Sequence, residues 1–180
     1  MTIHRHRGLV RVAAPAAEPI TLTEAKDFLR VTQDDDNARI NDMLVAVRTL
    51  AEQWLRRSLV TQSWKLSFAD CMTSGSRLPM GPVQGVTSIV TTTDDVAVTV
   101  ADTSYALSVA KDTIVLENTL YGDRVDITYV AGYGPASALP KPIKFGLLQH
   151  VALMYDGATG LAPIPDNVLS LYMPFREVAL

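Results

Sequence analysis

The spacing of apolar residues divides the chain into helical and extended segments. Between residues 36 and 57, apolar side chains recur three and four positions apart, so they line one face of about five helical turns. They are Ile40, Met43, Leu44, Val47, Leu50, Ala51, Trp54 and Leu55. The acidic run 34–36 precedes this segment and Arg56 and Arg57 close it, which complements the helix macrodipole. The pattern predicts a long amphipathic helix that packs on other helices.

A shorter helix is expected before the long one. Thr21 and Glu24 have the three-residue spacing of a capping box, in which hydroxyl and carboxylate satisfy free amides at a helix start. The sequence therefore predicts a helix from about Leu22 to Arg30.

Helical spacing returns after Pro140 and Pro142, because proline lacks the amide that would be unpaired at a helix entrance. Apolar residues then share one face as far as Gly157; they are Ile143, Leu147, Val151 and Met154. A brief further helix is predicted over 166–171, ended by Pro174.

Between the helical segments, from Ser63, the apolar period changes to two, as in strands. The alternating sets are Trp64, Leu66 and Phe68, then Tyr105, Leu107 and Val109, then Val125, Ile127 and Tyr129. Further strand-forming runs lie at 86–93, 96–100 and 113–116, and pairs containing aspartate mark turns at 94–95, 111–112 and 122–123. Short connections favour antiparallel pairing, since parallel strands need long crossovers.

These segments predict an α+β fold: a helical core of about four helices, with an antiparallel β insertion between the long second helix and the third helix. The expected organisation is a flexible amino-terminal arm at 1–19, a helical core at 20–60 and 138–173, a β insertion at 61–137 and a carboxyl-terminal docking tail at 174–180.

Composition narrows the functional classes. The 180 residues are 48% hydrophobic and 19% charged, with a formal net charge of −3, which indicates a globular protein without a general attraction to DNA or anionic membranes. Cys71 is the only cysteine, so no intrachain disulfide can form. No apolar run reaches the roughly 20 residues that span a bilayer. We expect a soluble, intracellular protein.

The sequence contains no complete catalytic, cofactor-binding or metal-binding motif. His4 and His6 are too few ligands for a metal cage. The acidic run 34–36 lacks the further oxygens and terminal glutamate of a calcium loop, and helix capping accounts for it. The segment 81–85 lacks the Lys-Ser/Thr pair of a phosphate loop and is interpreted as a turn.

Two reactive side chains, Cys71 and His150, offer an enzymatic alternative. Cys71, expected in a loop after a strand, could act as a nucleophile only if the fold brought a base such as His150 to it. No spacing supports that pair, and His150 is interpreted as a histidine at a core edge or an interface. The glycine-flanked Tyr133 is expected to mark a strand exit or a contact surface.

The order of several short motifs carries more information than any one of them. They are residues 20–26 (ITLTEAK), 29–31 (LRV), 34–36 (DDD), the long helix to Arg57, 61–64 (TQSW), 78–79 (LP), 82–83 (PV), 130–134 (VAGYG) and 140–144 (PKPIK). In this order, over roughly residues 19–157, the chain resembles the head-tail connector, or adaptor, proteins of long-tailed double-stranded DNA phages and gene transfer agents.

This resemblance implies a structural virion protein rather than an enzyme, without a cofactor or metal. It implies a ring of twelve subunits at the neck, below the portal at the capsid vertex, made in the bacterial host cytoplasm. Such a ring extends the DNA channel without binding DNA specifically, contacts the portal protein, and offers a platform for a tail-completion or stopper protein. The alternative is that this chain is itself a tail-completion or stopper protein of the same neck region.

The resemblance also suggests which surfaces meet partners. Candidates for the portal or tail interface are Tyr172, Phe175, Arg176, Val178 and Leu180. Candidates for the interface between subunits are Trp54, Arg56, Arg57 and Tyr133. A basic arm with Arg5, Arg7 and Arg11 either contacts DNA or an acidic portal surface, or is a solvated flexible tail.

Overall fold

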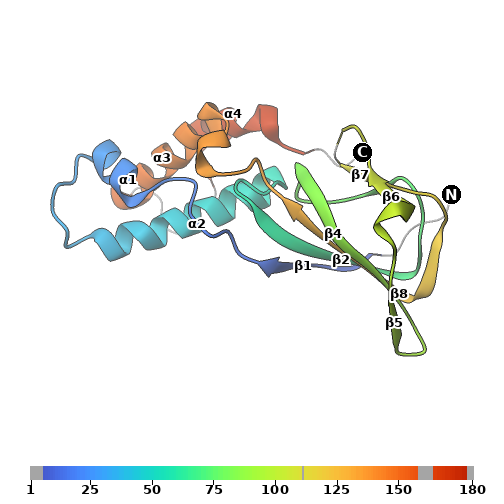
Figure 1. Ribbon diagram of the computed structural model, residues 1–180. Helices are drawn as coiled ribbons and strands as arrows, with labels where there is room; N and C mark the ends of the chain where they lie inside the picture. Colours follow the sequence, from blue (N-terminus) through green and yellow to red (C-terminus); the bar gives the residue numbers. More distant parts are fainter. Residues whose placement is uncertain (1–5, 111, 158–163, 178–180) are drawn as a thin grey trace. The chain divides into compact units, whose positions relative to one another are not determined.

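The computed structural model describes residues 6–110, 112–157 and 164–177 (Figure 1). The chain forms two compact units. One comprises residues 17–60 and 133–180 and contains the α-helices; the other comprises residues 1–16 and 61–132 and contains the β-strands. This architecture confirms the predicted α+β class with four helices and antiparallel sheets.

The helical unit is built around α2. Its α-helices are α1 (Leu22–Leu29), α2 (Asn37–Leu55), α3 (Lys141–Tyr155) and α4 (Asp166–Tyr172), with 3-10 turns at Ala136–Ala138 and Met173–Phe175. The predicted capping box is present at α1, because the Thr21 hydroxyl accepts from the Glu24 amide and the Glu24 carboxylate accepts from the Thr21 amide. α1 and α2 end on residues in the left-handed conformation, Arg30 and Arg56.

The apolar stripe of α2 faces the unit's core, as its period predicts. The core also receives one face of α3 and the buried residues of α4. Its buried members are Ile20, Ala25, Ile40, Leu44, Val47, Ala51, Leu55, Leu59, Leu139, Ile143, Leu147, Val151, Ile164, Val168 and Tyr172. Leu50, which the pattern assigns to the same stripe, is instead exposed because it lies at the edge of that face.

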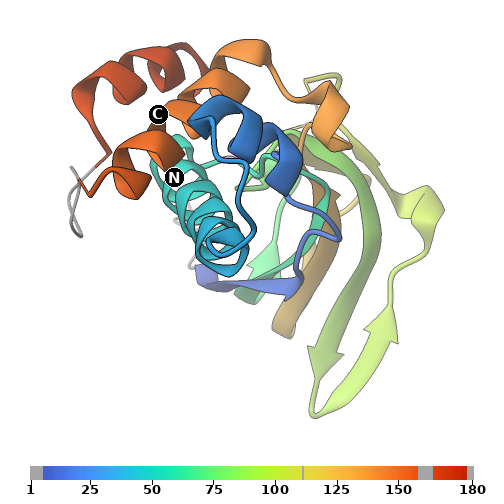
Figure 2. The same ribbon diagram turned by 90° about the vertical axis from the view of Figure 1, so that its left-hand side faces the viewer.

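The strand unit contains two antiparallel sheets. The strands are β1 (His6–Ala13), β2 (Gln62–Met72), β3 (Ser76–Arg77), β4 (Val83–Thr93), β5 (Val96–Thr99), β6 (Tyr105–Leu107), β7 (Thr113–Leu116) and β8 (Leu120–Ala131), and a 3-10 turn lies at Asp102–Ser104. The larger sheet has the order β1-β2-β8-β4-β5 and the smaller the order β3-β7-β6. Figure 2 shows β4 and β5 extending together as a long hairpin.

The two-residue period accounts for the β core. On β8, Val125, Ile127 and Tyr129 are buried while their neighbours are not, so one face of the strand is covered. Asp94 and Asp95 form the β4–β5 turn, and both have positive φ, as the hairpin turns that suit twisted strands require.

Several sequence-based expectations are wrong in detail. The predicted amino-terminal arm at 1–19 contains a strand: His6–Ala13 forms β1, which pairs with β2. Its backbone hydrogen bonds to β2 hold it, although its side-chain period is weak. Cys71 lies within β2 rather than in a loop, and Val109 lies beyond the end of β6 and is fully exposed.

No helix within the described ranges is long and apolar enough to cross a membrane.

Candidate assembly interfaces

Asp34, in the acidic run 34–36, makes contacts within the helical unit. Asp34 accepts hydrogen bonds from the Lys26 ammonium at 2.7 Å and from the Asn37 side-chain amide at 3.1 Å. The Lys26 bond, helped by the Asn37 bond, lowers the pKa of the Asp34 carboxyl. The carboxylate therefore fastens the connection between α1 and α2.

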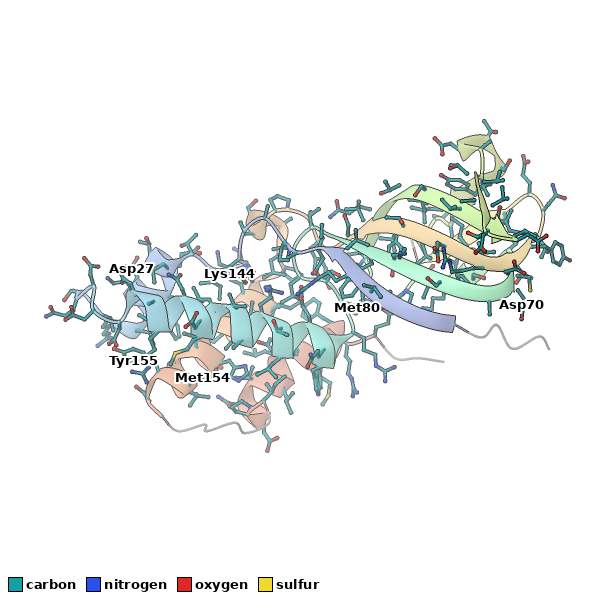
Figure 3. All side chains as sticks on the ribbon, turned by 90° about the horizontal axis from the view of Figure 1, so that it is seen from below. Asp27, Asp70, Met80, Lys144, Met154 and Tyr155 are labelled. Atoms are coloured by element: carbon teal, nitrogen blue, oxygen red, sulfur yellow. The ribbon has the colours of Figure 1, made fainter. Side chains whose placement is uncertain are left out.

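Asp36 has a different partner from the one that its position predicts. It stands before the first turn of α2 but makes no side-chain capping hydrogen bond, so the capping interpretation is wrong for this residue. Its carboxylate instead accepts the Tyr155 hydroxyl at 2.5 Å, an interaction that raises the pKa of Tyr155. Arg39 lies over the Tyr155 ring, 5.0 Å from its centroid. Together these contacts tie the start of α2 to the end of α3 (Figure 3).

No group of three or more histidine, cysteine, aspartate or glutamate side chains could hold a metal ion in the part of the chain that the structure describes. His4 lies outside the described residues, and the side chain of His6 is not described.

An ion network that the sequence analysis missed lies at the middle of α2. The Arg48 guanidinium donates to Glu18 at 2.7 Å and to Glu52 at 3.0 Å, and the other Glu52 oxygen accepts the Leu59 amide at 2.8 Å. Burial opposes the charge of Arg48, but the two carboxylates outweigh it and the pKa of Arg48 is raised. The four-residue spacing of Arg48 and Glu52 signals their pairing; nothing in the sequence signals Glu18.

The predicted subunit-interface residues lie near the end of α2 and in the segment that re-enters the helical unit. Trp54 is half-buried, 6.3 Å from Tyr172 between ring centroids. Arg56 is exposed. Burial raises the pKa of Tyr133, and the hydrogen bond and charge of Arg57 oppose that shift. Trp54, Arg57 and Tyr133 thus make contacts within the subunit, and a role between subunits stays a prediction.

The carboxyl-terminal candidates divide into a described and an undescribed part. Tyr172 is fully buried in the helical core, and burial raises the pKa of its hydroxyl. Phe175 packs against the same core while Arg176 is exposed, with its guanidinium 4.7 Å from the Trp54 indole centroid. The Glu177 amide donates to the Leu55 carbonyl at 2.9 Å. Val178 and Leu180 lie outside the described residues.

These contacts fasten the chain as far as Glu177 to the end of α2. Leu55 is the last residue of that helix, and carbonyls at a helix end lack partners within the helix. The Glu177 amide satisfies one of them, and Arg176 covers the neighbouring Trp54 ring as a cation–π contact. The part of the tail that the structure describes is therefore integrated into its own unit.

The basic arm is a strand at the edge of the larger sheet. Arg7 and Arg11 both belong to β1, and the Arg11 side chain is exposed. Arg5 lies outside the described residues. What the arginines contact stays a prediction.

The residues of the enzymatic alternative belong to different units. Cys71 is half-buried in β2 of the strand unit. His150 is buried on α3 of the helical unit, where burial lowers its pKa. Its Nδ1 atom has no hydrogen-bond partner among the described residues.

The helical unit also exposes an aromatic pair that the sequence analysis did not single out. The rings of Phe28 on α1 and Phe145 on α3 meet edge to face, with centroids 6.1 Å apart, yet 39% and 46% of the two residues remain exposed. Beside them the Lys144 ammonium donates to Glu24 at 2.5 Å, another link between α3 and α1 (Figure 3). An exposed aromatic pair of this kind is typical of contact surfaces.

Proteins in solved structures of gene transfer agent particles are similar to this chain. A protein in the neck of the empty gene transfer agent particle, computed with C6 symmetry, is similar to this chain with a TM-score of 0.78 and 23% identity over 96% of this chain and 97% of that one. A protein in the virion of the native particle gives 0.80 and 24% over 96% of each chain. A protein in the native neck, computed with C12 symmetry, gives 0.79 and 24% over 96% and 97%.

At these identities the structures establish a shared fold over nearly the whole chain. No curated protein matches the sequence. A family model described as "Head completion protein" matches residues 18–152, which is more than half of the chain and covers almost the entire region of the predicted resemblance. The match confirms that resemblance, and the chain belongs to the head completion protein family.

Proposed function

We propose that this protein is a structural head-tail connector in the neck of a phage or phage-like particle, where a ring of its subunits lies below the portal, extends the DNA channel and receives the tail. The observation that carries this proposal is the family match over residues 18–152. The shared fold with proteins of gene transfer agent particles supports it.

A ring of twelve is the assembly we favour. One of the similar necks was computed with C12 symmetry and another with C6 symmetry. Twelve equivalent copies fit both, since a twelvefold ring also has sixfold symmetry. Cyclic symmetry requires a head-to-tail contact between two different surfaces of the subunit.

The charge of the chain suits passage of DNA. Each phosphate that a protein neutralises adds salt-dependent affinity, so a strongly basic ring would hold the duplex in place. With a net charge of −3, the subunit has no such excess of positive charge. We therefore propose that DNA moves through the channel without specific binding.

The carboxyl-terminal residues are proposed to reach the portal. Glu177 is held at the end of α2 because its amide donates a hydrogen bond to the Leu55 carbonyl. Two truncations therefore test the portal contact differently. Removing 178–180 spares the Arg176–Trp54 contact and the Glu177 bond, whereas removing 175–180 would also damage the subunit.

Imaging of intact particles tests the proposed function. We expect averaged reconstructions from a producing strain to show this fold as a ring between portal and tail, and particles lacking the chain to have heads without tails. Truncation at Glu177 should leave the thermal unfolding midpoint unchanged and prevent attachment to the portal. A ring located below another neck protein would instead indicate a stopper or tail-completion protein, and a chain absent from mature particles would refute the proposal.

A further inference from the structure

The larger sheet of the strand unit is open, with β1 at one edge and β5 at the other. β1 pairs only with β2 and β5 only with β4 within the described residues. An edge strand has a row of backbone groups without sheet partners, so it is a template for pairing with another chain. This unit therefore has two such edges, on opposite sides of the sheet.

Both edges expose apolar side chains. On β1, Val10 and Val12 are 58% and 56% exposed. On β5, Val96 and Val98 are 63% and 57% exposed, and no residue of that strand is buried. Edge strands of proteins that stay apart usually carry charges, proline or β-bulges. β5 carries none of these, whereas β1 has arginines and two register irregularities beside its exposed valines. The valines of both edges are apolar surface that a further partner can cover.

The two edges have opposite charges. β1 carries Arg7 and Arg11, of which Arg11 has an exposed side chain. The turn that leads into β5 carries the exposed Asp94 and Asp95, with Asp123 beside it, since its carboxylate accepts the Asp94 amide at 2.9 Å.

Like charges oppose pairing of β1 with β1 or of the β5 turn with its own copy, whereas unlike charges favour pairing of β1 with β5. Because the two surfaces differ, repeated contacts of this kind join subunits head to tail, and they form a ring when the rotation closes.

We infer that β1 of one subunit pairs with β5 of a second copy of this chain, joining the larger sheets of neighbours around the ring. The inference rests on the proposed function for the ring itself and adds the surface that builds it. β5 is the outer strand of the β4–β5 hairpin (Figure 2), and all four of its residues are exposed, so a neighbour can reach this edge.

Cross-linking in assembled particles tests the contact. In a Cys71→Ser background, Val12→Cys labels β1 and Val96→Cys labels β5, and a short bismaleimide joins thiols that lie side by side. The doubly substituted chain should give a ladder of dimers, trimers and larger species, and each single-cysteine chain only monomers. Dimers from a single-cysteine chain would overturn the inference, because they require like edges to meet.

Imaging whether the chain is present as a ring in the necks of the same particles separates the edge pairing from the proposed function. Particles that contain the chain as a ring but give no ladder would overturn the edge pairing and leave the proposed function standing. Particles without the chain would refute the proposed function. Unchanged thermal unfolding of the purified variants is the folding control, since both substituted valines are exposed.

Charge reversal supplies a test that does not depend on cysteine. Arg11→Glu should lower the yield of tailed particles severalfold, because a carboxylate would face the acidic turn. Adding Asp94→Asn and Asp95→Asn removes that repulsion and should restore the yield, and asparagine tolerates the positive φ of both positions. Asp70→Asn, a matched exposed aspartate with positive φ, should not restore it. Equal yields from all these variants would contradict the pairing.

Discussion

Gly146 on α3 lies against the ring of Tyr172 on α4, so closely that no side chain fits between them. A β-carbon added at Gly146 would stand 2.5 Å from Cε1 of Tyr172 and 3.2 Å from its Cζ. Tyr172 is fully buried and cannot swing into solvent. The glycine therefore sets how closely α4 packs on α3.

We expect Gly146→Ala to destabilise the protein by about 1–3 kcal/mol, the usual range for overpacking a core. Alanine gains about 1 kcal/mol of helix propensity, which only partly offsets the clash. Thermal and urea unfolding measure the difference. Gly85→Ala, in strand β4, is the control for adding a methyl group where there is room, because no atom lies within 4 Å of its added β-carbon, and its effect should stay within about 0.5 kcal/mol.

A double variant separates the clash from other effects of the alanine. Tyr172→Leu leaves a cavity but removes the ring atoms that the alanine would meet. Gly146→Ala should therefore be less harmful in that background than in the native chain. Purely additive effects would show that the contact does not limit the packing.

The Arg48 network should be a main contributor to the stability of the helical unit. Arg48→Met removes the guanidinium that pairs with the buried Glu52 carboxylate, and breaking a buried pair in this way typically costs 3–5 kcal/mol. We expect a loss of about that size in urea unfolding. Glu18 keeps more contact with water and adds less.

Lys141→Met is the control for loss of a lysine or arginine charge, since Lys141 is exposed in the first turn of α3. Its removal should change stability by less than about 0.5 kcal/mol. Replacing Arg48 and Glu52 together by Met and Leu should recover part of the loss, because it removes the buried Glu52 charge. The recovery stays partial because the Leu59 amide loses its acceptor. A double variant as unstable as Arg48→Met would contradict this account.

Local patterns predicted most of the elements but few of the contacts between them. The period of α2 and the alternation on β8 follow from which face is buried, and the capping box follows from two residues three positions apart. Each of these signals lies within a single element. Strand β1 escaped prediction because its backbone pairing with β2, and not a side-chain period, holds it in place.

Contacts between distant segments could not be read in this way. Glu18 reaches Arg48 across 30 positions, and Tyr155 reaches Asp36 across 119. Asp36 stands at the N-cap position of α2, where its sequence favours a capping hydrogen bond to a backbone amide. In the folded chain its carboxylate accepts the Tyr155 hydroxyl instead. The candidate assembly residues could not be predicted from local patterns either, because a contact with another subunit or protein produces no periodic signal in the sequence.

The capping box at α1 offers a smaller and local test. Thr21→Ala removes the hydroxyl that accepts the Glu24 amide, and loss of such a cap typically costs about 1 kcal/mol. Urea unfolding should register that loss. Thr23→Ala is the matched control, because Thr23 is an exposed position inside the same helix and alanine favours helix there. Equal destabilisation by the two substitutions would show that the cap contributes nothing.

His150 should make the stability of the helical unit depend on pH. Burial lowers its folded pKa below the ordinary value of 6.5, so below that pH the unfolded chain binds a proton that the folded chain resists. The stability is fully present above pH 6.5 and falls as the pH drops toward the folded pKa, with a slope of at most about 1.4 kcal/mol per pH unit for one group.

The pH window isolates this histidine from the acidic residues. The carboxyls of Glu24 and Asp34 have pKa values lowered from 4.5 and 3.8, so their contributions are lost only at lower pH. Between pH 7.5 and 5.5 we therefore expect the unfolding free energy of the native chain to fall, and that of His150→Leu to change much less. Leucine keeps an apolar side chain at the buried site while removing the titrating group. Parallel pH profiles for the two proteins would mean that His150 accepts its proton equally well in both states, which its burial on α3 argues against.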